Sequence, residues 1–168
     1  NVAFLRIGSS LNSETNKRRS GFENGCLSRG LSCEMKILND GEPFSLFKEF
    51  LREHIRGGKF TFDGIFCVTD RLAWLIIKAL GKLGIHVPED VQVIGFDGIR
   101  YFGDEDYICS TIVQPVQEIA EMCVELLTRE SLSTKPPLVC LPVTYACGGT
   151  TREHTASLKE DAETMEIP

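Results

Sequence analysis

The clearest fold signals in this chain lie in the stretch Gly84-Ile85-His86-Val87-Pro88-Glu89-Asp90-Val91-Gln92-Val93-Ile94-Gly95-Phe96-Asp97. A glycine followed closely by a proline is the usual stop signal of a helix, so a helix is expected to end at Gly84. The apolar run 91–96 is short and bounded by turn residues, which predicts a buried strand of a parallel sheet. Open α/β sheets bind ligands at the carboxyl ends of their strands. Asp97 is therefore either a ligand contact or only the cap of the next turn.

The same alternation of strand and helix runs along most of the chain. Strands are expected at residues 2–7, 32–38, 64–68, 91–96, 111–113 and 138–141, and helices at 15–29, 44–55, 70–83 and 115–128. Repeated βα units form a parallel sheet with right-handed crossovers and helices on both faces. The predicted fold class is α/β, a doubly wound and mostly parallel sheet. The polar, acidic stretch 152–168 is predicted to be a surface tail.

Composition narrows the class of protein. The chain has 168 residues, 42% of them hydrophobic and 25% charged, which is typical of one globular domain. A net charge of −6 argues against a surface that grips DNA. The sequence shows no run long enough to span a membrane, and its first residues do not resemble a signal peptide. A cytoplasmic protein is expected because the cysteines read as reduced thiols.

The seven cysteines are read as reduced thiols. Their number is odd, they form no C-x-x-C pair, and none has a histidine at zinc-finger spacing. Cys67, Cys109 and Cys123 fall in apolar runs, where a free cysteine acts as a small hydrophobic residue. Neither a metal site nor a cofactor is expected.

Four motifs, within a match from residue 2 to about 151, resemble the effector-binding domain of LacI/GalR-family transcription regulators. Residues 84–97 resemble the family's G-(L/I)-x-V-P-x-D-(V/I)-x-(V/I)-x-G-(F/Y)-D, and residues 63–73 its strand followed by N-D-x-x-A, with Thr69 in place of the asparagine. Residues 110–115 resemble its T-T-(I/V)-x-Q-(P/D), and residues 18–22 its R-x-x-G-(F/Y). The resemblance implies one lobe of a periplasmic-binding-protein-like type I fold.

The resemblance also implies a function and a domain plan. The implied function is to bind a small polar effector, such as a sugar, in a homodimer that reaches DNA through a helix-turn-helix absent from this chain. Residues 1–114 would form the effector lobe, 115–143 would cross to a first lobe absent here, 144–151 would return, and 152–168 would be the tail. Two alternatives stay open: a solute-binding protein of a transport or chemosensory system, and a flavodoxin-like enzyme. The enzyme is disfavoured, because the sequence has no G-x-S-x-G elbow and no phosphate loop.

Polar side chains are expected to converge at the carboxyl edge of the sheet. Asp70, Asp97 and Gln114 each follow a strand, and Arg18 lies early in the first helix. Carboxylates, amides and guanidinium groups can bind sugars through paired hydrogen bonds. The resemblance places Arg18, Asp97 and Gln114 in the effector cleft. Asp70 could equally be the N-cap of its helix, and Arg18 could simply be solvated.

Two further candidates carry their own alternatives. Thr69 stands where the family has an asparagine that often bonds the effector, so its reach is shorter. Phe44 lies near a position where the family often has an aromatic residue that stacks on the ligand, but a residue at this place is more often a core residue of the next helix.

The helix expected at 70–83 has a second apolar face. One set of residues follows helical spacing and should face the sheet: Leu72, Leu75, Ile76, Ala79, Leu80 and Leu83. Ala73, Trp74 and Ile77 lie off that stripe. They either pack under a loop or form a two-fold dimer interface, which the family resemblance favours and which Tyr101 and Phe102 would join.

The helix expected at 115–128 carries a broad apolar face that needs a partner. This face consists of Val116, Ile119, Ala120, Cys123, Leu126 and Leu127. We expect the segment 115–141 either to pack against its own lobe in a position the family does not use, or to pair with the same segment of a neighbouring molecule.

Overall fold

The computed structural model describes residues 1–8, 13–39, 41–101, 106–128 and 139–152. The expectations for Phe102, for Leu138 and for the tail beyond Arg152 therefore lie outside the described residues. A six-stranded sheet with the order β2-β1-β5-β6-β7-β8 forms the centre of the molecule. Its strands are β1 (Val2–Ile7), β2 (Cys33–Leu38), β5 (Gly64–Cys67), β6 (Gln92–Asp97), β7 (Ser110–Val113) and β8 (Thr144–Ala146).

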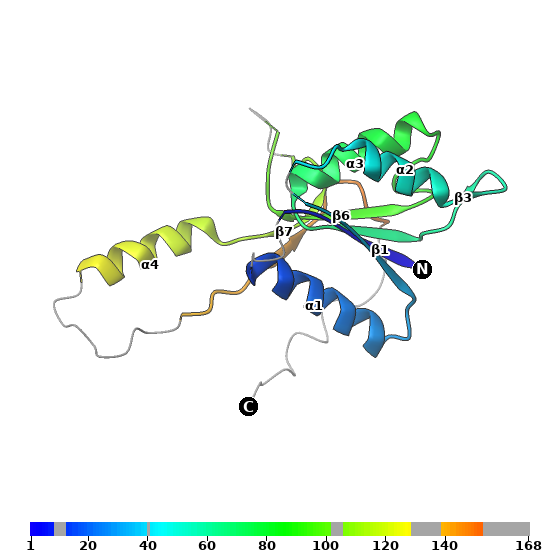
Figure 1. The fold of residues 1–168 in the computed structure, drawn as a ribbon. Coiled ribbons are helices and arrows are strands. Elements are labelled where there is room, and N and C mark those ends of the chain that lie inside the picture. The colour runs from blue at the N-terminus through cyan, green and yellow to red at the C-terminus, as the bar shows by residue number, and fades with distance from the viewer. Residues whose placement is uncertain (9–12, 40, 102–105, 129–138, 153–168) are drawn as a thin grey trace.

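Helices cover both faces of the sheet. Helix α1 (Ser13–Ser28) lies on one face, and α2 (Ser45–Glu53) and α3 (Asp70–Lys82) lie together on the other (Figure 1). All neighbouring strands from β2 to β7 are parallel, and β8 is antiparallel to β7. The predicted α/β class, a doubly wound and mostly parallel sheet, is confirmed.

A hairpin follows α2 where the sequence predicted a longer helix. Strands β3 (Ile55–Arg56) and β4 (Lys59–Phe60) pair in antiparallel register across Gly57 and Gly58. Both glycines have positive φ, 56° and 76°, as a two-residue hairpin turn requires. The predicted helix 44–55 therefore ends two residues early, at Glu53, and Ile55 belongs to β3.

The core lies mainly between the sheet and the α2–α3 layer. Helix α2 buries Phe47, Phe50 and Leu51, as its spacing predicted. Helix α3 buries Leu72, Ala73, Ile76, Ala79 and Leu80. Leu75 is only half-buried, whereas Ala73 is fully buried, so both were assigned to the wrong face. The sheet-facing stripe is rotated by part of a turn from the predicted one, and Ala73 is too deep to join a subunit interface.

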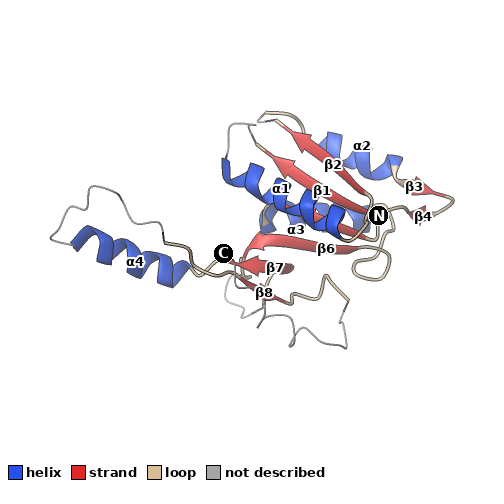
Figure 2. Cartoon of the chain, turned by 90° about the horizontal axis from the view of Figure 1, so that it is seen from below, coloured by secondary structure: helices blue, strands red, loops and turns tan. Residues whose placement is uncertain are grey.

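Helix α4 (Val116–Thr128) stands apart from the rest of the molecule. It projects away from the sheet after β7, and none of its residues is buried (Figure 2). Ile119 and Leu126 are 38% and 39% exposed, and Leu127 is 85% exposed. The expectation that this segment packs against its own lobe is therefore wrong, since no part of the lobe that the structure describes lies beneath α4.

The return of the chain from α4 differs from the prediction in one respect. The part of the expected strand 138–141 that the structure describes, residues 139–141, is not a strand. The strand comes later, as β8, whose register with β7 pairs Val113 with Thr144. Within the described ranges, no helix is long and apolar enough to cross a membrane.

Candidate functional site

The site is built on a strained turn at the carboxyl end of β6. Asp97 has a φ of 129°, the one positive φ of a non-glycine residue in the described chain. Side chains avoid this region, and the cost is of order 1–3 kcal/mol unless the surroundings impose it. Gly98 follows with a φ of 83° and lies against Val113, so the turn is tightly packed.

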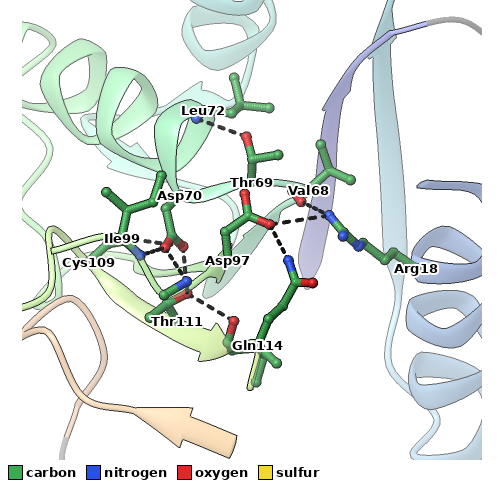
Figure 3. Close-up of polar contacts among 12 residues, drawn as sticks. Arg18, Val68, Thr69, Asp70, Leu72, Asp97, Ile99, Cys109, Thr111 and Gln114 are labelled. Atoms are coloured by element: carbon green, nitrogen blue, oxygen red, sulfur yellow. Dashed lines mark hydrogen bonds and ion pairs between the residues drawn. The ribbon is translucent and has the colours of Figure 1, made fainter. Parts of the chain in front are cut away.

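The carboxylate of Asp70 holds this turn in place. Its Oδ2 accepts hydrogen bonds from the backbone N–H groups of Gly98 at 2.8 Å and Ile99 at 2.6 Å. Its Oδ1 accepts from the Thr111 hydroxyl at 2.6 Å and from the Cys109 thiol at 3.6 Å (Figure 3). Asp70 is fully buried. Four donors on two oxygens make Asp70 a structural acid, and the reading of Asp70 as a direct ligand contact does not fit this geometry.

The N-cap of α3 is the neighbouring residue. Thr69 has extended backbone angles, and its side-chain oxygen accepts a hydrogen bond from the Leu72 N–H at 3.3 Å. The reading of Asp70 as the N-cap was therefore wrong. Capping occupies the Thr69 hydroxyl, so the replacement of the family's asparagine by threonine leaves a shorter group that is engaged with the helix.

The space around Asp70 admits no side chain at Gly95. A Cβ there would overlap Asp70 Oδ1 and lie 2.9 Å from Asp70 Cα and 3.0 Å from Cys109 Sγ.

Burial, together with the charge and hydrogen bond of Asp70, raises the pKa of Cys109 to about 12. Burial likewise raises the pKa of Cys67. These two thiols are inert core groups, as predicted, whereas Cys123 is exposed on α4.

Three predicted residues converge beside the strained turn. The Asp97 Oδ1 atom accepts a hydrogen bond from Gln114 Nε2 at 2.9 Å and lies 3.9 Å from Arg18 Nη1. The same guanidinium nitrogen donates to the Val68 carbonyl at 2.8 Å, which fixes the direction of the Arg18 side chain (Figure 3). The predicted convergence of Arg18, Asp97 and Gln114 at the carboxyl edge is thus observed.

An aromatic residue missed by the sequence reading completes this cluster. The Arg18 guanidinium lies 3.8 Å from the centre of the Phe96 ring. Such a stacked guanidinium is held in one plane and keeps its other N–H groups free to donate. The alternation of side chains along β6 puts Phe96 on the α1 side of the sheet, so period-two spacing was a usable signal for it.

Opposing effects act on the pKa of Asp97, and their net result is a raised pKa. Burial raises the pKa of Asp97, while Arg18 lowers it, the Asp70 charge raises it and the Gln114 hydrogen bond lowers it. The Asp97 and Arg18 side chains remain 29% and 21% exposed. The cluster therefore presents a carboxylate, an amide and a guanidinium to solvent, a set that can bind paired hydroxyl groups.

The other candidates lie elsewhere. The Phe44 ring packs against Phe47, with 5.7 Å between ring centres, and lines a small hollow between α2 and α3. It serves as a core residue, and the stacking reading is not supported. Among the described residues, no group of three histidine, cysteine or acidic side chains is placed to hold a metal ion.

The predicted interface residues differ in how far they are exposed. Trp74 and Ile77 are half-buried, and the Lys78 ammonium lies 3.4 Å from the centre of the Trp74 ring. Tyr101 is 44% exposed on the loop after β6. Ala73 belongs to the core, as described above.

Comparison with known proteins identifies the family. The model of the periplasmic binding protein-like domain matches residues 1–151. The chain belongs to this family. A sucrose operon repressor of Pediococcus pentosaceus is 32% identical over 137 residues, which are 77% of this chain and 39% of that repressor. A PurR-type transcriptional repressor of Serratia proteamaculans is 31% identical over 61% of this chain and 29% of its own length.

Solved structures of this family share the fold. A LacI-family regulator from Arthrobacter sp. FB24 in complex with lactose is 26% identical, with a TM-score of 0.66 over 90% of this chain and 57% of its own. The lac repressor dimer bound to operator matches with a TM-score of 0.67 and 20% identity, over 89% of this chain and 52% of its own. The resemblance to LacI-type regulators is confirmed, and this chain spans roughly half of each solved relative.

Proposed function

We propose that this chain is the effector-sensing lobe of a LacI-type transcription regulator and binds a small polar metabolite, such as a sugar, at the Arg18–Asp97–Gln114 edge. The observation that carries the proposal is this cluster, in which three polar side chains from three elements meet over a strained turn. Strain of this kind concentrates at binding sites, where a fixed side-chain direction is useful. The sucrose and ribose operon repressors among the relatives support a sugar as the effector.

The proposed regulator needs parts outside this chain. A first lobe would close the other side of the effector site and cover the apolar face of α4, with residues 115–143 crossing to it and residues 144–151, which include β8, returning. The exposed α4 and the match to 39% of the length of the Pediococcus repressor support this plan. DNA would be bound by a separate helix-turn-helix, which fits the net charge of −6 here. The proposed regulator acts in the cytoplasm without catalysis, and its repressor relatives favour it over a transport protein.

We further propose that the regulator is a homodimer joined near Trp74 and Ile77, with Tyr101 at the edge of the contact. Partly exposed aromatic and aliphatic residues on one helix face are typical of such interfaces. Effector binding would then act on DNA binding by favouring one dimer geometry over another.

The test is calorimetry of sucrose, ribose and lactose with the complete regulator and its variants. For the sugar that binds, Asp97→Ala should weaken affinity by ~1–3 kcal/mol, about 5- to 150-fold, because a buried polar contact is lost. Gln114→Ala should act in the same direction. Asp106→Ala, an exposed acid on the neighbouring loop, is the control. Unchanged affinity in the Asp97 variant would remove this residue from the site.

A further inference from the structure

Two cysteines meet where α1 ends and β2 begins. Cys26 lies in the last turns of α1, and Cys33 is the first residue of β2. The intervening chain reverses direction tightly, since the Leu31 N–H donates to the Cys26 carbonyl at 2.9 Å and Gly30 has a φ of 62° (Figure 1). The two residues are thus brought together by a short local turn.

The strand register turns both thiols toward the same space. Cys33 pairs side by side with Val2, and neighbours in register point to the same face of a sheet. Val2 lines a hollow with Phe22 of α1, so this is the α1 face. Glu34, the next residue, bonds His54 of α2 on the opposite face, as alternation requires. Cys26 is 4% exposed on the inner side of α1, and burial and the neighbouring Cys33 thiol raise the pKa of Cys26.

Arg18 anchors the N-terminal half of α1 through Val68 and Phe96. The contact at Cys26 matters because the C-terminal end of the helix has few other buried side chains. Among the α1 side chains that the structure describes, Cys26 alone is buried. Phe22 is half-buried and touches the rings of Phe4 and Phe66. A helix without a continuous apolar face depends on such isolated contacts and opens easily at its ends.

We propose that Cys26 and Cys33 form a dithiol–disulfide pair that hydrogen peroxide oxidises, and that the disulfide clamps the C-terminal end of α1 to the edge strand β2. The inference is independent of the proposed effector function. It adds a covalent modification site at the end of the helix that carries Arg18.

The chemistry balances with peroxide as the oxidant. Exposed Cys33 is the thiol that peroxide reaches. Its thiolate attacks one peroxide oxygen, the O–O bond breaks, and hydroxide leaves while Cys33 becomes a sulfenic acid. The Cys26 sulfur then attacks the Cys33 sulfur, the S–O bond breaks, and water leaves as the S–S bond forms. Burial raises the pKa of Cys26, which favours exposed Cys33 as the thiol that reacts with peroxide first.

Peptide mapping of the peroxide-treated chain tests the pairing. Trypsin cleaves after Arg19, Arg29 and Lys36, so Cys26 and Cys33 fall in the separate peptides 20–29 and 30–36. The expected product is these two peptides joined, with the mass of the pair less two hydrogens, and reduction should separate them. Cys33→Ser should abolish the joined product. Cys123→Ser, an exposed thiol on α4, should leave it unchanged.

Hydrogen exchange tests the clamp. Amides of residues 20–29 should exchange several-fold more slowly in the oxidised than in the reduced chain, while those of α3 should not change. Cys33→Ser alters an exposed position and should fold normally, and it should show no oxidant-dependent slowing. A disulfide from Cys33 to another cysteine, or overoxidation of Cys33 without a link, would overturn the pairing. A Cys26–Cys33 link without slower exchange in α1 would overturn the clamp.

Discussion

Asp97 occupies a backbone conformation that most residues avoid, and another acid keeps it there. The Asp70 carboxylate accepts from two consecutive N–H groups directly after Asp97. Two carboxylates that each follow a strand thus have separate roles: one organises the turn from inside, and the other faces solvent.

Removing the inner carboxylate should unfold this arrangement. Asp70→Ala leaves the N–H groups of Gly98 and Ile99 and the Thr111 hydroxyl without their acceptor. The free energy of unfolding should fall by at least about 2 kcal/mol, because buried donors lose bonds to a charged group. Urea denaturation measures this loss. Asp106→Ala, at an exposed position, should change stability by less than about 0.5 kcal/mol, and an equally small effect at Asp70 would contradict the assigned role.

The outer carboxylate should make stability depend on pH in a defined direction. Burial raises the pKa of Asp97 above its ordinary value of 3.8, so the folded chain binds this proton more tightly than the unfolded chain. Its contribution to stability is therefore present below 3.8 and is lost as pH rises through the raised pKa. Asp97→Asn does not titrate. The unfolding free energy of the variant should therefore increase relative to that of the wild type as pH rises from 3.8 to the raised pKa, and the difference should then stay constant. A difference that does not change with pH, or that falls, would contradict the raised pKa.

At the scale of elements, two glycines with opposite surroundings show where packing is tight. Gly81 lies in α3 with open space around it, so Gly81→Ala should stabilise the chain by roughly 0.5–1 kcal/mol. Gly95 lies in β6 against Asp70 and Cys109, so Gly95→Ala should destabilise it by roughly 1–3 kcal/mol. Thermal unfolding of both variants measures the contrast. Stabilisation by Gly95→Ala would mean that β6 can move away from α3, and destabilisation by Gly81→Ala would contradict the open space around Gly81.

Helix α4 should respond to mutation unlike the other helices. Leu127 is 85% exposed, so Leu127→Glu should change the unfolding free energy by less than about 0.5 kcal/mol and should reduce self-association. Leu80 in α3 is fully buried, and Leu80→Glu should prevent folding. Urea denaturation and light scattering separate the two effects. Strong destabilisation by Leu127→Glu would show that α4 packs on something in this chain.

At the scale of the whole molecule, the proposed dimer makes the outer side of α3 the sensitive surface. Trp74→Glu would bury an unpaired charge in the contact and should convert dimers to monomers, as sedimentation of the complete regulator would show. Leu27→Glu changes an equally apolar but 80% exposed residue on α1 and should leave the dimer intact. A wild-type monomer would contradict the proposed dimer, and a dimer that survives Trp74→Glu would place the interface elsewhere.

Local signals in the sequence were enough to predict the five parallel strands, their order along the chain and the end of the sheet where polar residues gather. These features depend on local signals: apolar runs, helix-stopping glycine and proline, and the fixed rule that parallel strands end at one edge. For that reason Arg18, Asp97 and Gln114 could be predicted to meet. The motifs that resemble LacI-type regulators added the family, which the match over residues 1–151 confirms.

Long-range contacts, which the sequence does not reveal, determine which of two similar acids is buried. Asp70 and Asp97 both follow strands, and their difference arises because Gly98, Ile99 and Thr111, 28 to 41 residues from Asp70 in sequence, converge on one carboxylate. The rotation of the α3 stripe and the exposure of α4 likewise depend on what lies opposite each helix. Helical spacing specifies which residues share a face, and only the surface that packs against that face determines whether it is buried.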